Sequence, residues 1–481
     1  MCIRDRSISD LEELISGIHN RGMKLIMDIV VNHTSDEHEF FKASKSSIDN
    51  PYRDYYIWKK PEANGGPPNN WMSFFGGSAW EYDETSEEYY LHLFSKKQPD
   101  LNWENPQVRS EIYDTLNFWL EKGIDGFRMD VIPLISKRND FPDTSQISFP
   151  KVIEEVYSNG PKVHDYIKEM VASSIANYDV MTVGEGPGIS KEVALDYVGK
   201  NRGELNMIFH LDHMYLGQGM EGKYTPVPYN LQDVKRIFNE WNEAIGSEGW
   251  ISIFLDNHDF PRMISRFGND DEYRIECAKL FCMLILTLRG TACIYQGSEI
   301  GMTNVAFESM NCYRDVETLN FYKEQKKLGM SDDEFLNMAH KYSRDNARTP
   351  MQWNDEKNGG FSKNGQCWID VNPNYKFVNV EACEKNTDSI LFFYKKMIKL
   401  RKSHKTLIYG QYEELSKGHD QLFIYRRWDS QHSFIICLNM SEEAIDISDY
   451  ITSDVKCILS NQGNSNNTKL GPWAAKLFKN N

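Results

Sequence analysis

The chain has 481 residues, of which 40% are hydrophobic and 26% charged, and its formal net charge is −16. These values are typical of a large globular protein with one extensive core. The acidic balance argues against nucleic acid or an anionic membrane as a partner, because both repel negative charge. The nine cysteines are scattered without a CxxC pair, which favours free thiols in a reducing cytoplasm over a disulfide framework or a zinc site.

The first six residues, MCIRDR, are unusual. A DNA sequence that encodes them resembles the transposon end used to fragment DNA for sequencing. We therefore expect residues 1–6 to be an assembly artefact joined to a shortened gene; the alternative is an ordinary N-terminal extension. We expect no signal peptide here. The longest apolar run, at 280–288, is far too short to span a bilayer.

From residue 7 onward, the pattern predicts alternating helices and strands. Apolar residues at helical spacing predict a helix over 9–22 with Ser9 as its N-cap, and the apolar run 23–33 predicts a buried parallel strand. The other predicted helices are 106–121, 164–177, 230–245 and 272–289, and the other predicted strands are 125–132, 180–186, 205–211, 250–259 and 293–298. This alternation predicts an α/β barrel or an open α/β sheet.

Two regions interrupt the alternation. Residues 34–103 are rich in Trp, Tyr, Asn and Gly and lack helical periodicity, so we predict an inserted domain that forms a wall of the substrate cleft. From residue 404 onward, short alternating segments such as 421–428 and 433–440 predict a small antiparallel β domain. We therefore assign the barrel to 7–33 and 104–403, the inserted domain to 34–103 and the C-terminal domain to 404–481.

Polar side chains cluster where the predicted strands end. Arg128 and Asp130 share one face of the strand 125–132, and that strand alone leaves open whether they form only a structural ion pair. Barrel enzymes assemble their active sites at this face, from the ends of several strands. The same arrangement recurs at His33, Glu185, His258 and Asp259. Because two carboxylates can supply the nucleophile and the acid of a glycosidase, the convergence favours a catalytic role.

Seven segments in order resemble the α-amylase superfamily, glycoside hydrolase family 13. Those matching its four signature regions are DIVVNH (28–33), GFRMDVI (126–132), VGEGPG (183–188) and LDNHD (255–259). Those matching its oligo-1,6-glucosidase and α-glucosidase group are KKQPDLNW (96–103), YQGSEIGMTN (295–304) and SRDNARTPMQW (343–353). The resemblance runs from residue 7 onward. It implies a (β/α)8 TIM barrel, an inserted domain after the third strand and a C-terminal antiparallel β-sandwich domain.

The resemblance implies a role for each matching residue. Asp130 matches the nucleophile of a retaining glycosidase, Glu185 the general acid/base and Asp259 the stabiliser of the transition state. Arg128 would hold Asp130 ionised and oriented. The residues that match contacts of the glucose in the −1 subsite are His33, His258 and Arg348.

Two further positions bear on specificity. Val131 follows the nucleophile, where valine accompanies α-1,6 cleavage in related glucosidases, and threonine or alanine accompanies α-1,4 cleavage. Valine lacks a hydroxyl that could bind a +1 sugar; the alternative is a valine that only packs. Gly186 follows the acid, where the group usually has methionine, so we expect a roomier +1 subsite.

The sequence also departs from the family at its beginning. The family's barrel starts with a strand, a helix and a second strand before the segment that matches residue 7. That part would carry an aspartate and a tyrosine of the −1 subsite and the loop that binds a calcium or magnesium ion. We therefore expect no metal site and no required cofactor. Since a barrel lacking two strands leaves edges unpaired, we expect this chain to fold poorly or to be inactive.

The resemblance implies a cytoplasmic, monomeric, retaining exo-α-glucosidase that cleaves α-1,6 bonds at the non-reducing ends of isomalto-oligosaccharides. The expected partner is a small oligosaccharide substrate, and neither nucleic acid nor a membrane. Trehalose-6-phosphate hydrolase, dextran glucosidase and α-1,4-glucosidase use the same scaffold and stay open. Sucrose isomerase is disfavoured because no aromatic–arginine motif follows Asp259. A non-catalytic amylase-like subunit is disfavoured because all three acids are present and no anchor is visible.

Overall fold

A computed structural model describes residues 7–144, 148–220, 222–363, 365–452, 455–463 and 468–480. The suspected artefact at residues 1–6 lies outside these described residues. The chain divides into two compact units. The first consists of Met1–Leu211 and Ala244–Ile251, and the second of Asp212–Glu243 and Ser252–Asn481. The limits of the barrel, inserted and C-terminal domains stay predictions.

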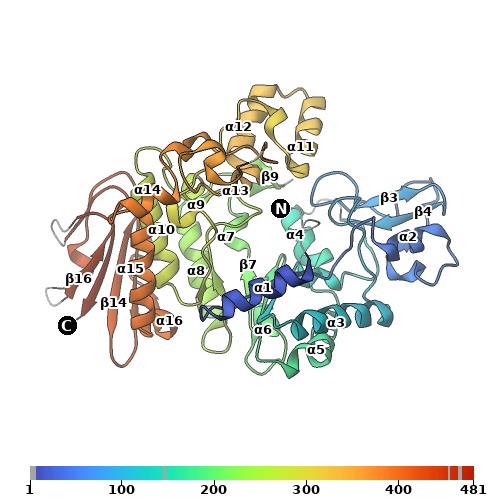
Figure 1. Ribbon diagram of the computed structural model, residues 1–481, viewed down its shortest axis with the longest axis horizontal. Helices are drawn as coiled ribbons and strands as arrows, with labels where there is room; N and C mark the ends of the chain where they lie inside the picture. Colours follow the sequence, from blue (N-terminus) through green and yellow to red (C-terminus); the bar gives the residue numbers. More distant parts are fainter. Residues whose placement is uncertain are drawn as a thin grey trace. The chain divides into compact units, whose positions relative to one another are not determined.

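The first unit contains a parallel four-stranded sheet in the order β1-β5-β6-β7, of which Figure 1 labels β7. Its strands are β1 (Met27–Val30), β5 (Gly126–Asp130), β6 (Met181–Gly186) and β7 (Met207–His210). The helices that alternate with them are α1 (Ile8–His19), α3 (Pro106–Glu121), α5 (Val163–Ser173) and α6 (Ala194–Val198), with the short α4 (Phe149–Val152) before α5. Parallel strands need such crossover connections. The predicted βα alternation is therefore confirmed.

Register places the predicted site residues at one end of this sheet. Asp28 pairs with Arg128 and Val30 with Asp130 across β1 and β5. Parallel strands end at the same edge, so the carboxyl ends of β1, β5 and β6 present their last side chains together.

Several predicted boundaries are wrong. α1 is capped by Ser7, not Ser9, because the Ser7 side chain and the Asp10 carboxylate form a reciprocal capping box. The strand predicted at 250–259 is only β10 (Ser252–Ile253). The strand predicted at 293–298 is also misplaced, because β11 (Thr291–Ala292) precedes it and a left-handed turn at Gly297 interrupts extended backbone.

Residues 34–103 form a small antiparallel sheet in the order β2-β4-β3. Its elements are α2 (Glu39–Ser46), β2 (Trp58–Lys59), β3 (Trp80–Asp83) and β4 (Glu88–Leu91). Their aromatic side chains form a core: Trp71, Trp80 and Leu91 are buried in one cluster that also contains Val131, directly after β5. The inserted region therefore packs against the end of the strand that carries Arg128 and Asp130.

The second unit ends in an antiparallel sheet in the order β12-β13-β14-β18-β16, which confirms the predicted C-terminal β domain. These strands are Gln411–Glu414, Leu422–Trp428, Ser433–Asn439, Ala475–Asn480 and Val455–Ser460. Its longer helices are α8 (Leu231–Ile245, whose last two residues lie in the first unit), α10 (Arg274–Thr287), α11 (Val316–Lys327), α12 (Asp332–Tyr342) and α15 (Ile390–Ser403). The shorter elements are α7 (Asp212–Tyr215), α9 (Met263–Phe267), α13 (Asp345–Arg348), α14 (Val380–Lys385), α16 (Thr406–Tyr409), β8 (Gln218–Gly219), β9 (Gly222–Pro226), β15 (Ile445–Asp446) and β17 (Lys469–Leu470).

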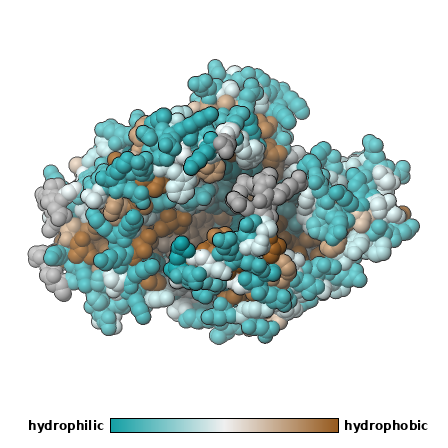
Figure 2. All heavy atoms as spheres, viewed as in Figure 1, coloured by the Kyte–Doolittle hydropathy of each residue, from teal (hydrophilic) through white to brown (hydrophobic). Residues whose placement is uncertain are grey.

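The surface in Figure 2 is mostly hydrophilic on the viewed face. Over the part of the chain that the structure describes, no helix combines the length and the apolar character needed to cross a membrane.

Candidate active site

Arg128 joins the two carboxylates that the sequence predicts as nucleophile and acid. Its Nη1 donates to Asp130 Oδ1 at 2.5 Å, and its Nη2 lies 2.8 Å from Glu185 Oε2. Nη1 also donates to Asp28 Oδ1 at 2.9 Å. Burial disfavours the charged guanidinium, but Glu185, Asp130 and Asp28 outweigh that cost and raise the pKa of Arg128 above its ordinary value. The guanidinium therefore stays charged and holds both carboxylates in place.

The backbone turns sharply directly after Asp130. β5 ends there, and Val131 adopts left-handed backbone angles, with φ 38° and ψ 41°. A β-branched residue rarely takes this conformation, so the turn is strained. The turn aims the Val131 N–H at Glu185 Oε2, 3.1 Å away. Simple alternation of side chains along β5 does not predict this hydrogen bond to Glu185. Val131 makes it because the strand ends at Asp130 and the backbone turns there.

The side of Gly186 where a side chain would project is already filled. A Cβ atom there would lie 3.0 Å from Ile189 Cδ1 and 3.2 Å from the Phe209 carbonyl oxygen. A side chain at position 186 would therefore require Ile189 to shift by a few tenths of an ångström, and the expectation of a roomier +1 subsite stays a prediction.

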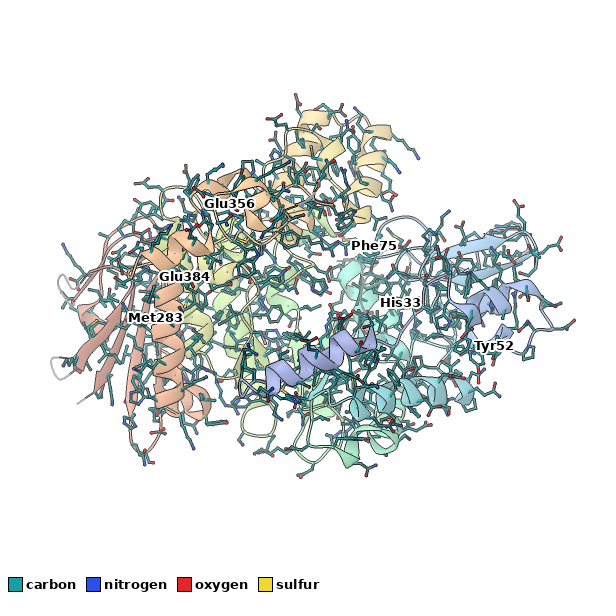
Figure 3. The ribbon with its side chains drawn as sticks, in the orientation of Figure 1. His33, Tyr52, Phe75, Met283, Glu356 and Glu384 are labelled. Carbon is teal, nitrogen blue, oxygen red and sulfur yellow. The ribbon has the colours of Figure 1, made fainter. Side chains whose placement is uncertain are left out.

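His33 follows β1 and is buried near the same sheet edge (Figure 3). Its Nε2 lies 3.0 Å from Gln98 Nε2, and its ring packs against Phe94 with centroids 5.1 Å apart. Burial lowers the pKa of His33, although Asp100 and Asp130 act in the opposite direction. A neutral imidazole suits hydrogen bonding to a sugar hydroxyl, because it can donate at one nitrogen and accept at the other.

Sequence reasoning missed Lys137, which ties the inserted region to β1. Its Nζ lies 2.9 Å from Asp100 Oδ2 and donates to Asn32 Oδ1 at 2.9 Å and to the Leu134 carbonyl at 2.6 Å. Only 4% of the Lys137 side chain and none of the Asp100 side chain is exposed. The signal was a lysine at the end of an otherwise apolar run, IPLIS, which must find partners if it is buried.

The second unit holds a separate cluster around Asp259. His258 Nε2 lies 3.2 Å from Asp259 Oδ2, and Arg348 Nη2 donates to Asp259 Oδ1 at 2.7 Å. Arg344, which sequence reasoning missed, donates to the same oxygen at 3.2 Å. Burial acts to raise the pKa of Asp259, but the neighbouring positive charges of His258, Arg344, Arg348 and Lys223 outweigh it and lower the pKa to about 2. Asp259 is therefore a permanent anion at neutral pH.

The structure thus brings the predicted residues into two groups. Arg128, Asp130, Val131 and Glu185 are in direct contact in the first unit, where His33 also lies. His258, Asp259 and Arg348 are in direct contact in the second unit. The catalytic roles of Asp130, Glu185 and Asp259 and the substrate-binding roles of the other five residues stay predictions.

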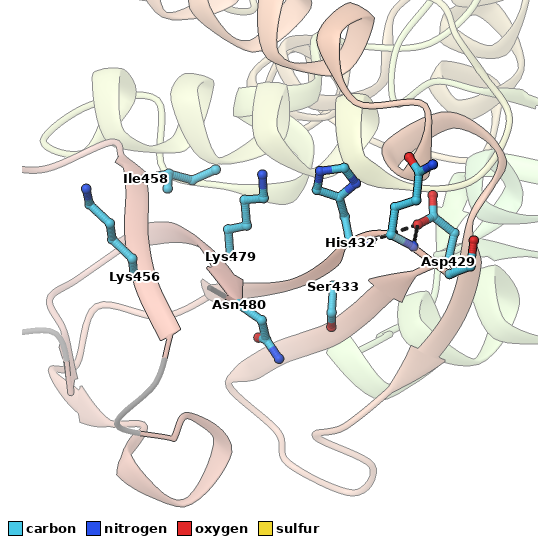
Figure 4. A pocket seen from close by; sticks show the side chains of 9 residues that line it. Asp429, His432, Ser433, Lys456, Ile458, Lys479 and Asn480 are labelled. Atoms are coloured by element: carbon cyan, nitrogen blue, oxygen red, sulfur yellow. Dashed lines mark hydrogen bonds between the residues drawn. The ribbon is translucent and has the colours of Figure 1, made fainter.

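Two cavities lie apart from the carboxylate pair. One, of about 630 Å³, is lined by residues of β1, α2 and α3 and includes His33, but neither Asp130 nor Glu185. The other, of about 500 Å³, lies in the C-terminal domain among Lys456, Lys479 and His432 (Figure 4). Among the described residues, its lining has a single carboxylate, Asp429, and these residues therefore do not supply the two acids that glycoside cleavage needs. Across the residues that the structure describes, no group of three or more His, Cys, Asp and Glu side chains could hold a metal ion.

The arrangement in the first unit can perform acid–base and nucleophilic chemistry. The Asp130 carboxylate, held by the Arg128 guanidinium, can attack an electrophilic carbon. Glu185 accepts a hydrogen bond from the Val131 N–H and forms an ion pair with Arg128. It lies near the end of the neighbouring strand, β6, where it can exchange a proton with a substrate oxygen.

Residues 7–410 match the family described as alpha amylase, catalytic domain. The chain belongs to the α-amylase family. An oligo-1,6-glucosidase of Halalkalibacterium halodurans is 47% identical over 482 residues, which cover 98% of this chain and 86% of that protein. A trehalose-6-phosphate hydrolase of Bacillus subtilis is 42% identical over 93% of this chain and 80% of its own length. The crystal structure of isomaltulose synthase from Erwinia rhapontici superposes with a TM-score of 0.93 at 39% identity, covering 99% of this chain and 86% of that one.

The match confirms the fold class predicted from the sequence. The α-amylase catalytic domain with its α/β barrel and a C-terminal β domain accounts for the parallel sheet of the first unit and the antiparallel sheet of the second.

Proposed function

We propose that the protein is a retaining exo-α-glucosidase that hydrolyses α-1,6-glucosidic bonds at the non-reducing ends of isomalto-oligosaccharides. The observation that carries the proposal is the bridge from Arg128 to both Asp130 and Glu185, at 2.5 and 2.8 Å. One guanidinium that contacts both acids keeps them close, as the roughly 5–5.5 Å separation of a retaining pair requires. The substrate class is supported by relatives named oligo-1,6-glucosidase at 45–47% identity.

The reaction uses these two carboxylates in turn. Asp130 attacks the anomeric carbon and forms a glucosyl-enzyme bond, while Glu185 gives its proton to the leaving oxygen. Glu185 then takes a proton from water, which attacks the same carbon and restores Asp130 as a free carboxylate. Two inversions at one carbon retain its configuration. Asp259 stabilises the positive charge that develops on the sugar ring.

Sugar binding rests on the neighbouring polar side chains. His33 and His258 bind hydroxyls of the glucose in the −1 subsite, and Arg348 binds near its non-reducing end. Val131, buried in the cluster of Trp71, Trp80 and Leu91 directly after Asp130, has no hydroxyl that could bind a +1 sugar. That favours an α-1,6 linkage over an α-1,4 linkage.

The proposal also covers the compartment, the oligomeric state and the cofactor requirement of the enzyme. It acts in the cytoplasm as a monomer on a small oligosaccharide, without an organic cofactor or an essential metal ion. The eight cysteines that the structure describes, Cys277, Cys282, Cys293, Cys312, Cys367, Cys383, Cys437 and Cys457, are free thiols, which suits a reducing compartment.

Trehalose-6-phosphate hydrolysis is the second candidate, because the relative of that name is 42% identical over most of the chain. Glucose release from isomaltose, maltose and trehalose 6-phosphate separates the candidates, with Asp130→Asn as the inactive control. Preference for isomaltose, with α-glucose as the first anomer detected by proton NMR, supports the proposal. Preference for trehalose 6-phosphate overturns it, and so does the absence of turnover of all three substrates by the folded chain.

A further inference from the structure

Arg344 lies in a buried chain of charges that ends at Asp259. It precedes α13, and its exposed fraction is only 8%. Its Nη1 donates to Asp259 Oδ1 at 3.2 Å, while its Nη2 and Nε donate to Asp315 Oδ1 at 2.5 and 2.9 Å. Its Nε also lies 3.2 Å from Glu317 Oε2. One guanidinium therefore connects Asp259 to two acids of the segment that begins α11.

Asp315, the anchor at the other end of this series of charged side chains, is rigidly held. Asp315 is the N-cap of α11 and accepts from the backbone N–H and the hydroxyl of Thr318. Its side chain is fully buried, and the positive charges of Arg344 and Lys223 lower its pKa despite burial. Glu317 is fixed in turn by Lys223, 2.6 Å away. An arginine held by such partners has little freedom to change its rotamer.

The backbone that carries Arg344 is fixed as well. Asp345 accepts the backbone N–H groups of Arg314 and Asp315, at 2.6 and 3.0 Å. Asn346 accepts the N–H of Val305 at 3.1 Å. Arg344 and Arg348 are four residues apart, one helical turn, so both reach Asp259 from the same side.

We propose that Arg344 is a positioning residue that holds the Asp259 carboxylate in one orientation by tethering it to the buried anchor Asp315. The inference rests on the proposed function, in which Asp259 stabilises the transition state. Arg348 and His258 also contact Asp259, but the −1 sugar shares both of them. Arg344 also contacts the carboxylates of Asp315 and Glu317, which belong to the protein and not to the substrate, so these contacts hold it beside Asp259 through the catalytic cycle.

The alternative is a purely structural ion pair, which a mutation would disturb without a specific effect on Asp259. Breaking a buried pair destabilises either way, so stability alone cannot separate the two. The pKa of Asp259 can separate the two roles. Four charged groups face Asp259, namely His258, Arg344, Arg348 and Lys223, and removing Arg344 leaves the other three, so the pKa of Asp259 rises without returning fully to its ordinary value.

The test compares Arg344→Met, Arg344→Lys and Asp315→Asn in the full chain, with Arg236→Met as the control, because Arg236 is exposed on α8. We expect Arg344→Met to lower kcat by about 10²-fold, the loss that a displacement near 1 Å can cause, with little change in KM. The acid limb of kcat/KM moves to higher pH. In Arg344→Lys the acid limb stays near its wild-type position, because lysine supplies the charge. The kcat of this variant still falls, because lysine lacks the planar fork of the guanidinium.

A second readout does not need activity: the carboxyl 13C resonance of Asp259, assigned with Asp259→Asn and followed against pH. An upward pKa in Arg344→Met supports the inference, and an unchanged midpoint with unchanged kcat overturns it. If Arg344→Met does not fold, Asp315→Asn decides, because it keeps the arginine charge and removes only its anchor. A wild-type chain without turnover counts against the proposed function, whereas the titration still reports on Arg344.

Discussion

The contact of Lys137 with Asp100 gives the sharpest prediction about stability. The pair is almost fully buried, and Lys137 also bonds Asn32 and a backbone carbonyl. In Lys137→Met, the Asp100 carboxylate stays buried without its cation. Removing one partner of a buried pair costs about 3–5 kcal/mol. For a domain of about 200 residues, each kcal/mol shifts Tm by about 2–4 °C, so Tm falls by roughly 6–20 °C.

Thermal unfolding followed by circular dichroism measures this loss. The matched control is Lys151→Met, which breaks an exposed pair with Glu154 and should cost less than about 1 kcal/mol. Lys137→Met combined with Asp100→Asn should be more stable than the sum of the single changes predicts, because no unpaired charge remains. A Tm for Lys137→Met within about 2 °C of wild type, which is less than 1 kcal/mol, would refute the reasoning.

Three further predictions follow from the site and its supports. Val131→Thr should raise the ratio of maltose to isomaltose hydrolysis, because it adds a hydroxyl on the +1 side; an unchanged ratio would leave Val131 a packing residue. Asp130→Asn should abolish glucose release while Tm changes little, and residual wild-type rates would exclude Asp130 as nucleophile. For Asp125, burial opposes ionisation, but Lys24, the Leu25 N–H and His19 outweigh it and lower the pKa from 3.8 to about 2. The stability that ionised Asp125 adds is therefore complete above pH 3.8 and is lost as the pH falls toward 2. The free energies of unfolding in urea of Asp125→Asn and of the wild type should accordingly become equal near pH 2.

Helices and the contact between Arg128 and Asp130 were the parts that sequence could predict. Helix α3 occupies Pro106–Glu121, as its periodicity indicates, because a helix buries one stripe whatever lies beyond it. Alternation along β5 placed Arg128 and Asp130 on one face, where they bond. These features depend on neighbours along the chain.

The rest depends on contacts between distant segments. Lys137 and Asp100 are far apart in the sequence, and nothing local in either predicts the other. Arg344 stands four residues before Arg348, inside a segment that had already been singled out, yet its tie to Asp315 requires α11 and α13 to be placed first. The left-handed Val131 was also beyond pattern reasoning, since valine disfavours that conformation.

The measurement that tests the account most directly is the rate of glucose release from isomaltose and from maltose by the wild-type chain and by Asp130→Asn. We expect faster release from isomaltose than from maltose, and none by the variant. Faster release from maltose, or release that survives Asp130→Asn, would contradict it.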